Sequence, residues 1–323
     1  MNTPWLGEFP PSASLEDIFY CFRLILGRRP SEKEWPGHSS RLGDKLQEVV
    51  ATYVNSQEFH NRGLMNSPQT QHFECAQLDG FAMFASPDDI AVGKHLLWLN
   101  DYEPHVSHPF RSALRPGMRV LDIGANIGFY SLLAASRVGS AGEVLSVEPN
   151  AANVALILRS SAKNNFKNVR IIQAAAYDAW EPLKLFVDSS NGAVSAIDPT
   201  HPNSCGGTVM GLPLSAVIAE SHIDVVKIDV EGAEGRAMQG MWNVIERSMP
   251  VVFSEFTPDS MPTMSGISAR EYLQLFLGLG YHISVLDKSG GRIECGDDPD
   301  AVMHVFQAAN DSHIDLLFQR GAS

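Results

Sequence analysis

The sequence predicts an α/β fold: a small helical module followed by a mostly parallel sheet that ends in an antiparallel hairpin. From Met118 onward, continuous apolar runs alternate with helix-length segments, which is typical of a parallel sheet covered on both faces. Late in the chain, two apolar stretches without a long helix between them indicate the hairpin. The expected strands are 119–123, 143–147, 169–174, 225–229 and 251–255, with hairpin strands at 282–286 and 301–307.

A separate helical module is expected at the N-terminus. Ser14 and Asp17 form an S-x-x-D pattern, in which the serine hydroxyl can cap the first turn of a helix. Apolar residues follow at helical spacing, and a second stripe of the same period runs over 42–53. We therefore divide the chain into a helical N-terminal module, residues 1–66, and a larger domain, residues 67–323. The alternative is a helical cap that packs on the larger domain.

Composition and charge argue against several kinds of partner. The formal net charge is −13, with one short basic run at Gly27–Arg29, whereas a nucleic-acid partner would favour a basic stripe. No apolar run of about 18 residues is present, so no transmembrane segment is expected. The N-terminus shows no signal-peptide pattern, and the four cysteines form no C-x-x-C pair, which favours a reducing compartment. We expect a soluble cytoplasmic protein.

A glycine turn follows the first strand of the predicted sheet, in the sequence VLDIGANIGFYS over 120–131. In an open α/β sheet, ligands bind beyond the carboxyl ends of the strands. Gly124 lets a ligand approach the backbone, and the helix that follows the turn offers unpaired N–H groups. The glycines are spaced G-x-x-x-G, so the G-x-G-x-x-G pattern of dinucleotide-binding folds is absent. The turn predicts a nucleotide-like ligand.

Carboxylates stand at the ends of the later strands. Glu148 ends the second strand, where a carboxylate suits a pair of ribose hydroxyls. Asp178 follows the third strand and can accept a hydrogen bond from an exocyclic amine such as that of adenine. The fourth strand ends in Asp229, Glu231 and Glu234, and the fifth ends in Glu255. Together with the glycine turn, these strand ends form a fairly specific set.

These motifs resemble the FkbM-type methyltransferases, which use S-adenosylmethionine (SAM). The matching segments are LDIGANIGFYS at 121–131, VEPN at 147–150, IDVVKIDVEGAE at 223–234 and SEF at 254–256. Upstream, NDYEP at 100–104 and LRPG at 114–117 are similar to that family's approach to the first strand. The resemblance covers residues 75–320 and implies a Rossmann-like methyltransferase fold, usually acting on a hydroxyl oxygen of a sugar or natural product.

The resemblance implies where the cofactor binds. SAM has no pyrophosphate, so a turn that binds it can place Asn126 where a dinucleotide binder has glycine. Glu148 would bind the ribose, Asp122 would lie near the ammonium group or the turn backbone, and Asp178 near the adenine amine. The expected cofactor-binding residues are Asp122, Gly124, Ala125, Asn126, Gly128, Glu148, Pro149, Asp178 and Asp229.

Methyl transfer to an alcohol demands positioning, and a base within hydrogen-bond reach of the acceptor helps. Asp229 is the first candidate for this base, followed by Glu255 and Glu231. If these carboxylates converge, they could instead hold Mg²⁺, although a metal is not favoured. The irregular stretch over 183–214 could fold over the ligand. The residues expected to face the acceptor are Glu103, His105, His108 and His201.

The sequence thus favours a SAM-dependent O-methyltransferase that acts on a small-molecule or saccharide acceptor. Two N-terminal stretches, LILGRRPSEKEW and VVATYVNSQEFHNR, resemble a short helical module of bacterial cell-surface and glycan-related proteins. We expect this module to contact the acceptor, a second subunit or a partner enzyme. Two other interpretations stay open: an NAD-dependent oxidoreductase with Glu148 on the ribose, and a non-catalytic nucleotide-binding or scaffold protein that acts through the N-terminal helices.

Overall fold

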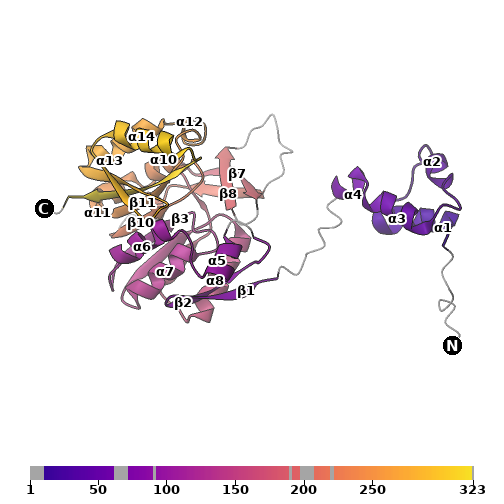
Figure 1. Cartoon of the computed structure of the whole chain (residues 1–323), viewed down its shortest axis with the longest axis horizontal. Helices are drawn as coiled ribbons and strands as arrows, with labels where there is room; N and C mark the ends of the chain where they lie inside the picture. Colours follow the sequence, from indigo (N-terminus) through magenta and orange to yellow (C-terminus); the bar gives the residue numbers. More distant parts are fainter. Residues whose placement is uncertain are drawn as a thin grey trace. The chain divides into compact units, whose positions relative to one another are not determined.

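The computed structural model of the chain (Figure 1) describes residues 11–61, 72–89, 92–188, 191–196, 207–218 and 222–321. The chain forms two compact units, Met1–His72 and Phe73–Ser323. The first unit is helical, and the second contains the main sheet. In the part of the chain that the structure describes, no helix is both long enough and apolar enough to cross a membrane.

Short helices around a small apolar core build the N-terminal unit. Its helices are α1 Leu15–Tyr20, the π-helix η1 Cys21–Ile25, α2 Trp35–Ser39, α3 Leu46–Val54 and α4 Gln57–Asn61. The expected cap is present, because Ser14 Oγ accepts from the Asp17 N–H and the Asp17 carboxylate accepts from the Ser14 N–H. Phe22 and Tyr53 are buried in the core and bring the two helical stripes of the sequence together.

An eight-stranded sheet organises the second unit, in the order β13-β12-β14-β11-β10-β3-β4-β5. The strands are β3 Arg119–Ile123, β4 Glu143–Val147, β5 Val169–Ile172, β10 Val225–Ile228, β11 Val251–Phe256, β12 Tyr281–Leu286, β13 Arg292–Gly296 and β14 Ile314–Arg320. Neighbours from β11 to β5 are parallel, whereas β14, β12 and β13 pair antiparallel. The expected mostly parallel sheet with antiparallel C-terminal strands is confirmed.

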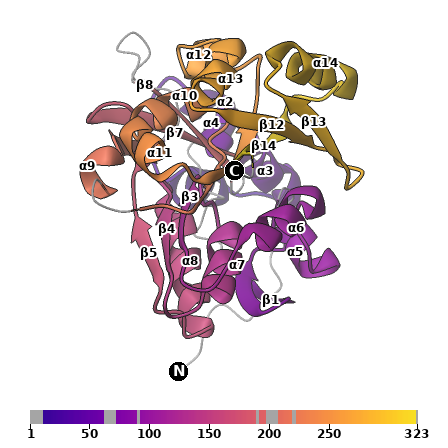
Figure 2. The same cartoon turned by 90° about the vertical axis from the view of Figure 1, so that its left-hand side faces the viewer.

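Helices cover both faces of this sheet (Figure 2). Successive strand residues point to opposite faces, so each central strand contributes side chains to two cores. Val120 of β3 belongs to a core shared with α6 Pro104–Ala113, α7 Phe129–Val138 and α8 Ala151–Lys163. Leu121 belongs to a second core shared with α10 Glu234–Gln239, α11 Trp242–Ser248 and α13 Ala269–Gly278. The hairpin of β1 Glu74–Leu78 and β2 Phe81–Ala85 packs into the first core. This unit also contains α5 Gly93–Leu99, α9 Ser215–Ile218 and α12 Met261–Met264.

The segment 301–307 is helical, so the expectation of a strand there is wrong. Helix α14 spans Pro299–Ala309, and it begins where the Asp298 side chain accepts from the Asp300 N–H. Val302 and Phe306, four residues apart, are its buried residues, which is the period of a helix face. The chain then returns as β14 between β11 and β12, and the hairpin partner of β12 is β13.

The stretch 183–214 forms a second sheet, so the expectation of an irregular loop is wrong for most of its described residues. Strands β6 Ala175–Ala176, β7 Glu181–Asp188, β8 Asn191–Ala196 and β9 Gly207–Leu212 pair in the order β6-β9-β7-β8. Leu183 and Leu185 are buried against Tyr177 and Ala233 in a small core. This burial of alternate residues in β7 explains why a segment rich in polar and turn-forming residues is extended.

Candidate active site

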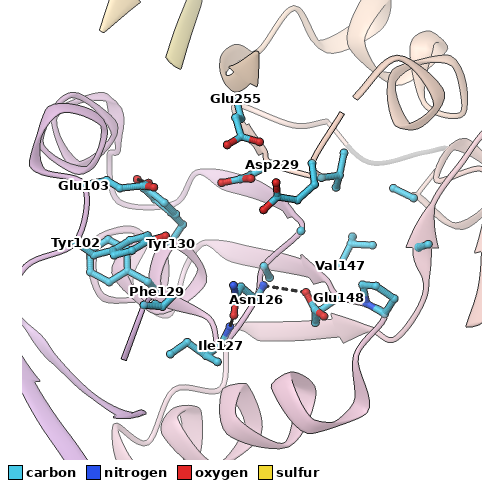
Figure 3. Close-up of a pocket in the computed structure, with 18 of the residues that line it drawn as sticks. Tyr102, Glu103, Asn126, Ile127, Phe129, Tyr130, Val147, Glu148, Asp229 and Glu255 are labelled. Atoms are coloured by element: carbon cyan, nitrogen blue, oxygen red, sulfur yellow. Dashed lines mark hydrogen bonds between the residues drawn. The ribbon is translucent and has the colours of Figure 1, made fainter. Parts of the chain in front are cut away.

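A pocket of about 370 Å³ opens at the carboxyl ends of the parallel strands (Figure 3). Asn126 after β3, Glu148 after β4, Asp229 after β10 and Glu255 in β11 all line it. Glu103, just before α6, lines the same pocket. The sheet therefore brings together side chains that lie far apart in the sequence, at the edge where an open α/β sheet binds its ligands.

Contacts within the chain itself require the two glycines of the turn. Gly124 has φ +76°, and a Cβ atom there would lie 1.7 Å from the carbonyl oxygen of Asp229. Gly128 has φ +98°, and its Cβ would lie 2.9 Å from Cγ1 of Ile157. Gly124 thus makes room for the end of the neighbouring strand β10 as well as lying at the pocket. Gly124, Ala125 and Asn126 line the pocket, whereas Gly128 begins α7 behind them.

Asp122 lies beneath the turn rather than in the pocket lining. It is 1% exposed, and its Oδ2 accepts from Ser131 Oγ at 2.5 Å. Ser131 in turn contacts Ser146 Oγ at 2.6 Å, which ties β3, α7 and β4 together. Burial raises the pKa of Asp122 to about 6, although the Ser131 hydrogen bond opposes this rise. Asp122 therefore supports the turn from below.

Glu148 lies at the end of β4 and is held in a fixed orientation. Its Oε2 accepts from the Asn126 N–H at 2.9 Å, and its Oε1 accepts from the Asn150 N–H at 2.8 Å. Asn153 Nδ2 donates to Oε1 at 3.3 Å. Burial raises the pKa of Glu148 to about 7 against the effect of these hydrogen bonds. The adjacent Pro149 also lines the pocket.

A buried ammonium group underlies the acidic side of the pocket. Lys227, in β10, is 1% exposed, and its Nζ donates to Asp229 Oδ2 at 2.9 Å. Burial alone would lower the pKa of Lys227, but the carboxylates of Asp229, Glu103 and Asp315 raise it. The Nζ atom also lies 5.0 Å from the centre of the Tyr130 ring. Lys227 therefore stays charged, and it holds the Asp229 carboxylate by an ion pair.

Glu103 completes the wall opposite Glu148 (Figure 3). It has φ +44°, a left-handed conformation, directly before α6. Its Oε2 accepts from the Tyr130 hydroxyl at 2.8 Å. Burial raises the pKa of Glu103, and Lys227 opposes that rise. Tyr102 and Tyr130 form the aromatic part of this wall, with ring centres 6.5 Å apart.

Glu255 and Glu231 lie beside Asp229 and make the pocket strongly acidic. Glu255 is 9% exposed, and its Oε2 is buried with no hydrogen-bond partner. Burial, followed by repulsion from Asp229, raises the pKa of Glu255 well above its ordinary value and raises that of Glu231 as well. The imidazole of His313 lies near Glu255, with Nδ1 3.8 Å from Oε1. Asp229, Glu231 and Glu255 thus converge as the sequence suggested.

Several expected site residues lie elsewhere. Asp178 is absent from the pocket lining, and its Oδ2 accepts from Arg236 NH1 at 2.6 Å. His105 is buried against Asp315, at 2.9 Å from Nε2 to Oδ2, and it also lies outside the lining. Neither side chain is among the residues that line the pocket, and the ligand contacts expected of them stay predictions. His108 is exposed and outside the lining, and His201 lies outside the described residues.

Sequence reasoning missed three of the groups that shape the site. Lys227 is the first residue of KIDVEGAE at 227–234, and the sequence indicates only that it lies in a strand. The fold shows that its side chain is buried among carboxylates. Tyr102 and His313 reach the pocket from the segment before α6 and the loop before β14. His313 could not be identified as a pocket residue from the sequence, because the strand that follows it, β14, is not among the predicted strands. Among the described residues, no group of three or more His, Cys, Asp or Glu side chains could hold a metal ion.

Comparisons with known proteins identify one family and several structural relatives. A family model described as the methyltransferase FkbM domain matches residues 122–283. A methyltransferase FkbM from Methylobacillus flagellatus KT is similar in structure, with 14% identity and a TM-score of 0.41 over 93% of this chain. The match spans 58% of that longer protein. A search of curated proteins gives no match.

Two further solved structures are similar at low identity. Aeropyrum pernix fibrillarin, whose structure contains natively bound S-adenosyl-L-methionine, has 10% identity and a TM-score of 0.40, with 76% of this chain and 98% of that chain covered. A SAM-dependent O-methyltransferase from Thermotoga maritima has 12% identity and a TM-score of 0.39, with 75% of each chain covered.

Proposed function

Because the chain belongs to the FkbM methyltransferase family, we propose that it transfers a methyl group from SAM to a hydroxyl oxygen of a saccharide or secondary metabolite. The observation that carries this proposal is the placement of Glu148, fixed at the end of β4 in an acidic pocket that begins at the glycine turn. When bound, the cofactor supplies an electrophilic methyl group on a sulfonium cation.

The residues present fit such a cofactor. Each carboxylate oxygen has two lone pairs, so Glu148 Oε2, which accepts from the Asn126 N–H, can also accept from a ribose hydroxyl. Hydrogen bonds from the ribose would favour the ionised form of Glu148, whose pKa burial raises to about 7. Glu103, Asp229 and Glu231 line the same pocket, and their charges suit a bound sulfonium and ammonium group.

The acceptor hydroxyl would lie beside Asp229. The ion pair with Lys227 fixes the orientation of this carboxylate, which is 29% exposed at the pocket. Glu231 and Glu255 lie close by, but their raised pKa values mean that each holds a proton more tightly than an ordinary carboxyl. Of the three carboxylates, Asp229 is the one that we propose to accept a hydrogen bond from a hydroxyl group of the acceptor molecule and so to orient that molecule.

We propose that this transfer uses no metal ion. The Lys227 ammonium group lies 2.9 Å from Asp229 Oδ2, so one of the oxygens that a cation shared by Asp229, Glu231 and Glu255 could use is already paired. A Mg²⁺ ion there would face a fixed positive charge at close range, which costs energy in a buried site. Activity that is unaffected by EDTA is therefore the expected result, and activity lost in EDTA and restored by Mg²⁺ would contradict it.

The N-terminal unit is proposed to contact the acceptor, a second copy of the chain or a partner enzyme. Leu24 and Leu42 are 75% and 58% exposed there, so this unit offers apolar surface that a partner could bury. A cytoplasmic location is proposed as well, because Cys21, Cys75 and Cys295 are free thiols. If the surface around Leu24 joins two copies of the chain, Leu24→Asp should lower the mass measured by light scattering. An unchanged mass would exclude a dimer formed through this surface.

The proposed reaction is tested with SAM carrying a tritiated methyl group and a panel of methyl glycosides of hexoses and deoxyhexoses. We expect the label to appear as an ether on a glycoside. Asp229→Asn should lower turnover by about 100-fold while SAM still binds, and Asp259→Asn, at an exposed position, is the matched control. Label recovered on nitrogen or carbon, or full turnover by Asp229→Asn, would contradict the proposal.

A further inference from the structure

A single imidazole lines the pocket among the residues that the structure describes, and we propose that His313 is the group that takes the proton from the acceptor hydroxyl during methyl transfer. This inference rests on the proposed function. Strand β14 pairs antiparallel with β11, with Glu255 opposite Asp315 and Phe256 opposite Ile314. The residue before β14 is therefore carried to the carboxyl end of β11, where the pocket lies.

Carboxylates surround this imidazole on several sides. Nδ1 lies 3.8 Å from Glu255 Oε1 and 3.2 Å from Ser312 Oγ, and the side chain is 29% exposed. Glu231, after β10, and Asp311, in the same loop, are close enough for the charge of His313 to lower their pKa values. A positive charge formed on His313 is thus stabilised by acidic groups from the loop after β10 and from its own loop.

The carboxylates of the pocket are less suited to the same task. Asp229 Oδ2 already accepts a hydrogen bond from Lys227 Nζ, so one of its two oxygens is occupied. Glu103 accepts from the Tyr130 hydroxyl, and burial among like charges raises the pKa of Glu255 well above its ordinary value. Imidazole is the side chain that exchanges a proton between pH 5 and 8, which is what a base working near neutral pH requires.

The proton balance of the step is simple. With its own proton on Nδ1, toward Glu255 and Ser312, the imidazole keeps the lone pair of Nε2. The acceptor oxygen bonds to the methyl carbon as the carbon–sulfur bond breaks and leaves its electron pair on sulfur. The hydroxyl proton passes to Nε2, so the positive charge lost from sulfur reappears on His313. Asp229 orients the acceptor through a second hydroxyl group, and the carboxylates of Glu231 and Asp311 stabilise the resulting imidazolium.

The placement is testable without knowing the acceptor. SAM and S-adenosylhomocysteine differ by the methyl group and one positive charge, so a base next to the reacting atoms must sense the difference. At a fixed pH near 7, the NMR signal of the His313 ring in the full chain should move toward that of the protonated imidazole when S-adenosylhomocysteine replaces SAM. His313→Asn assigns the signal, and the signal of His304, exposed on α14, should be the same in both complexes.

The outcomes separate the two proposals. If calorimetry on the same sample shows that both ligands bind and the His313 ring signal is the same in each complex, then His313 is not beside the reacting atoms and the inference fails. If neither ligand binds, the proposed function fails first. With a labelled glycoside in hand, His313→Asn should lower kcat by about 100-fold with SAM affinity unchanged. An unchanged kcat would overturn the role of His313 and leave the methyltransferase assignment standing.

Discussion

Replacing Lys227 by methionine tests whether a buried cation holds the acidic side of the pocket together. Lys227 is 1% exposed, its Nζ is 2.9 Å from Asp229 Oδ2, and Glu103 and Asp315 also act on its charge. Methionine keeps most of the volume but leaves these carboxylates without their cation. Removing one partner of a buried ion pair costs about 3–5 kcal/mol, and we expect a loss in that range in the free energy of unfolding at pH 7.5.

The pH dependence of this loss has a definite sign. In Lys227→Met, the folded-state pKa of Glu103, which burial already raises, rises further because the neighbouring positive charge is gone. A raised carboxyl pKa gives stability that is present at low pH and lost as the pH rises. The deficit of the variant should therefore shrink from pH 7.5 to pH 5.5, and adding Asp229→Asn should recover part of it.

The assay is urea unfolding followed by tryptophan fluorescence, with free energies compared at the two pH values. Lys288→Met is the control, because Lys288 pairs with Asp311 at an exposed site and its loss should cost about 0–1 kcal/mol. A deficit for Lys227→Met below about 1 kcal/mol, or one equal at both pH values, would refute the ion-pair reasoning.

Three further changes follow from the same geometry. Glu148→Gln should weaken SAM binding about 10- to 100-fold, which calorimetry measures, and equal SAM affinity would count against Glu148. Burial raises the pKa of Glu148 to about 7, so ionising this side chain lowers the stability of the ligand-free protein as the pH rises from 5 to 7. In urea titrations, Glu148→Gln should therefore lose less stability over this pH range than the unaltered chain. Gly124→Ala should unfold the turn or displace Asp229, as its Cβ would lie 1.7 Å from a carbonyl oxygen, whereas Gly278→Ala, in open space, should change the melting temperature little. Ser131→Ala should cost about 1–3 kcal/mol of unfolding free energy by leaving the buried carboxylate below the turn without its 2.5 Å donor; a neutral result in urea unfolding would contradict this.

The central strands and the turn could be predicted because their patterns are local. A short apolar run that ends in a polar residue marks both a buried parallel strand and the place where its ligand-facing end lies. Asn126, Glu148, Asp229 and Glu255 all reach the pocket for this reason. Family resemblance added the identity of the expected cofactor, which the pattern of acids alone left open between SAM and NAD.

The C-terminal part could not be predicted in the same way because its signals are ambiguous. The run 301–307 is apolar enough for a strand, and only the cap at Asp298 and the spacing of Val302 and Phe306 favour the helix that forms. Because a strand is predicted where α14 forms, the sequence does not predict β14 after it. The position of His313 at the pocket is therefore not predicted either.

Long-range partners were equally invisible in the sequence. Asp178 is expected near adenine because it follows a strand, and the sequence gives no sign that Arg236, 58 residues away, donates to its Oδ2. His105 is likewise taken by Asp315, 210 residues away. Such pairings depend on which elements the sheet order brings together, and no local spacing encodes them.

Calorimetry of the full chain with SAM, S-adenosylhomocysteine and NAD at pH 7.5 tests the methyltransferase assignment most directly. Three features predict that SAM and S-adenosylhomocysteine each bind at one site per chain: the acidic pocket, the Glu148 carboxylate that we propose binds the ribose, and a turn with Asn126 in place of a second glycine. NAD, which carries a pyrophosphate, should give no heat of binding. Binding of NAD without binding of SAM would contradict the assignment.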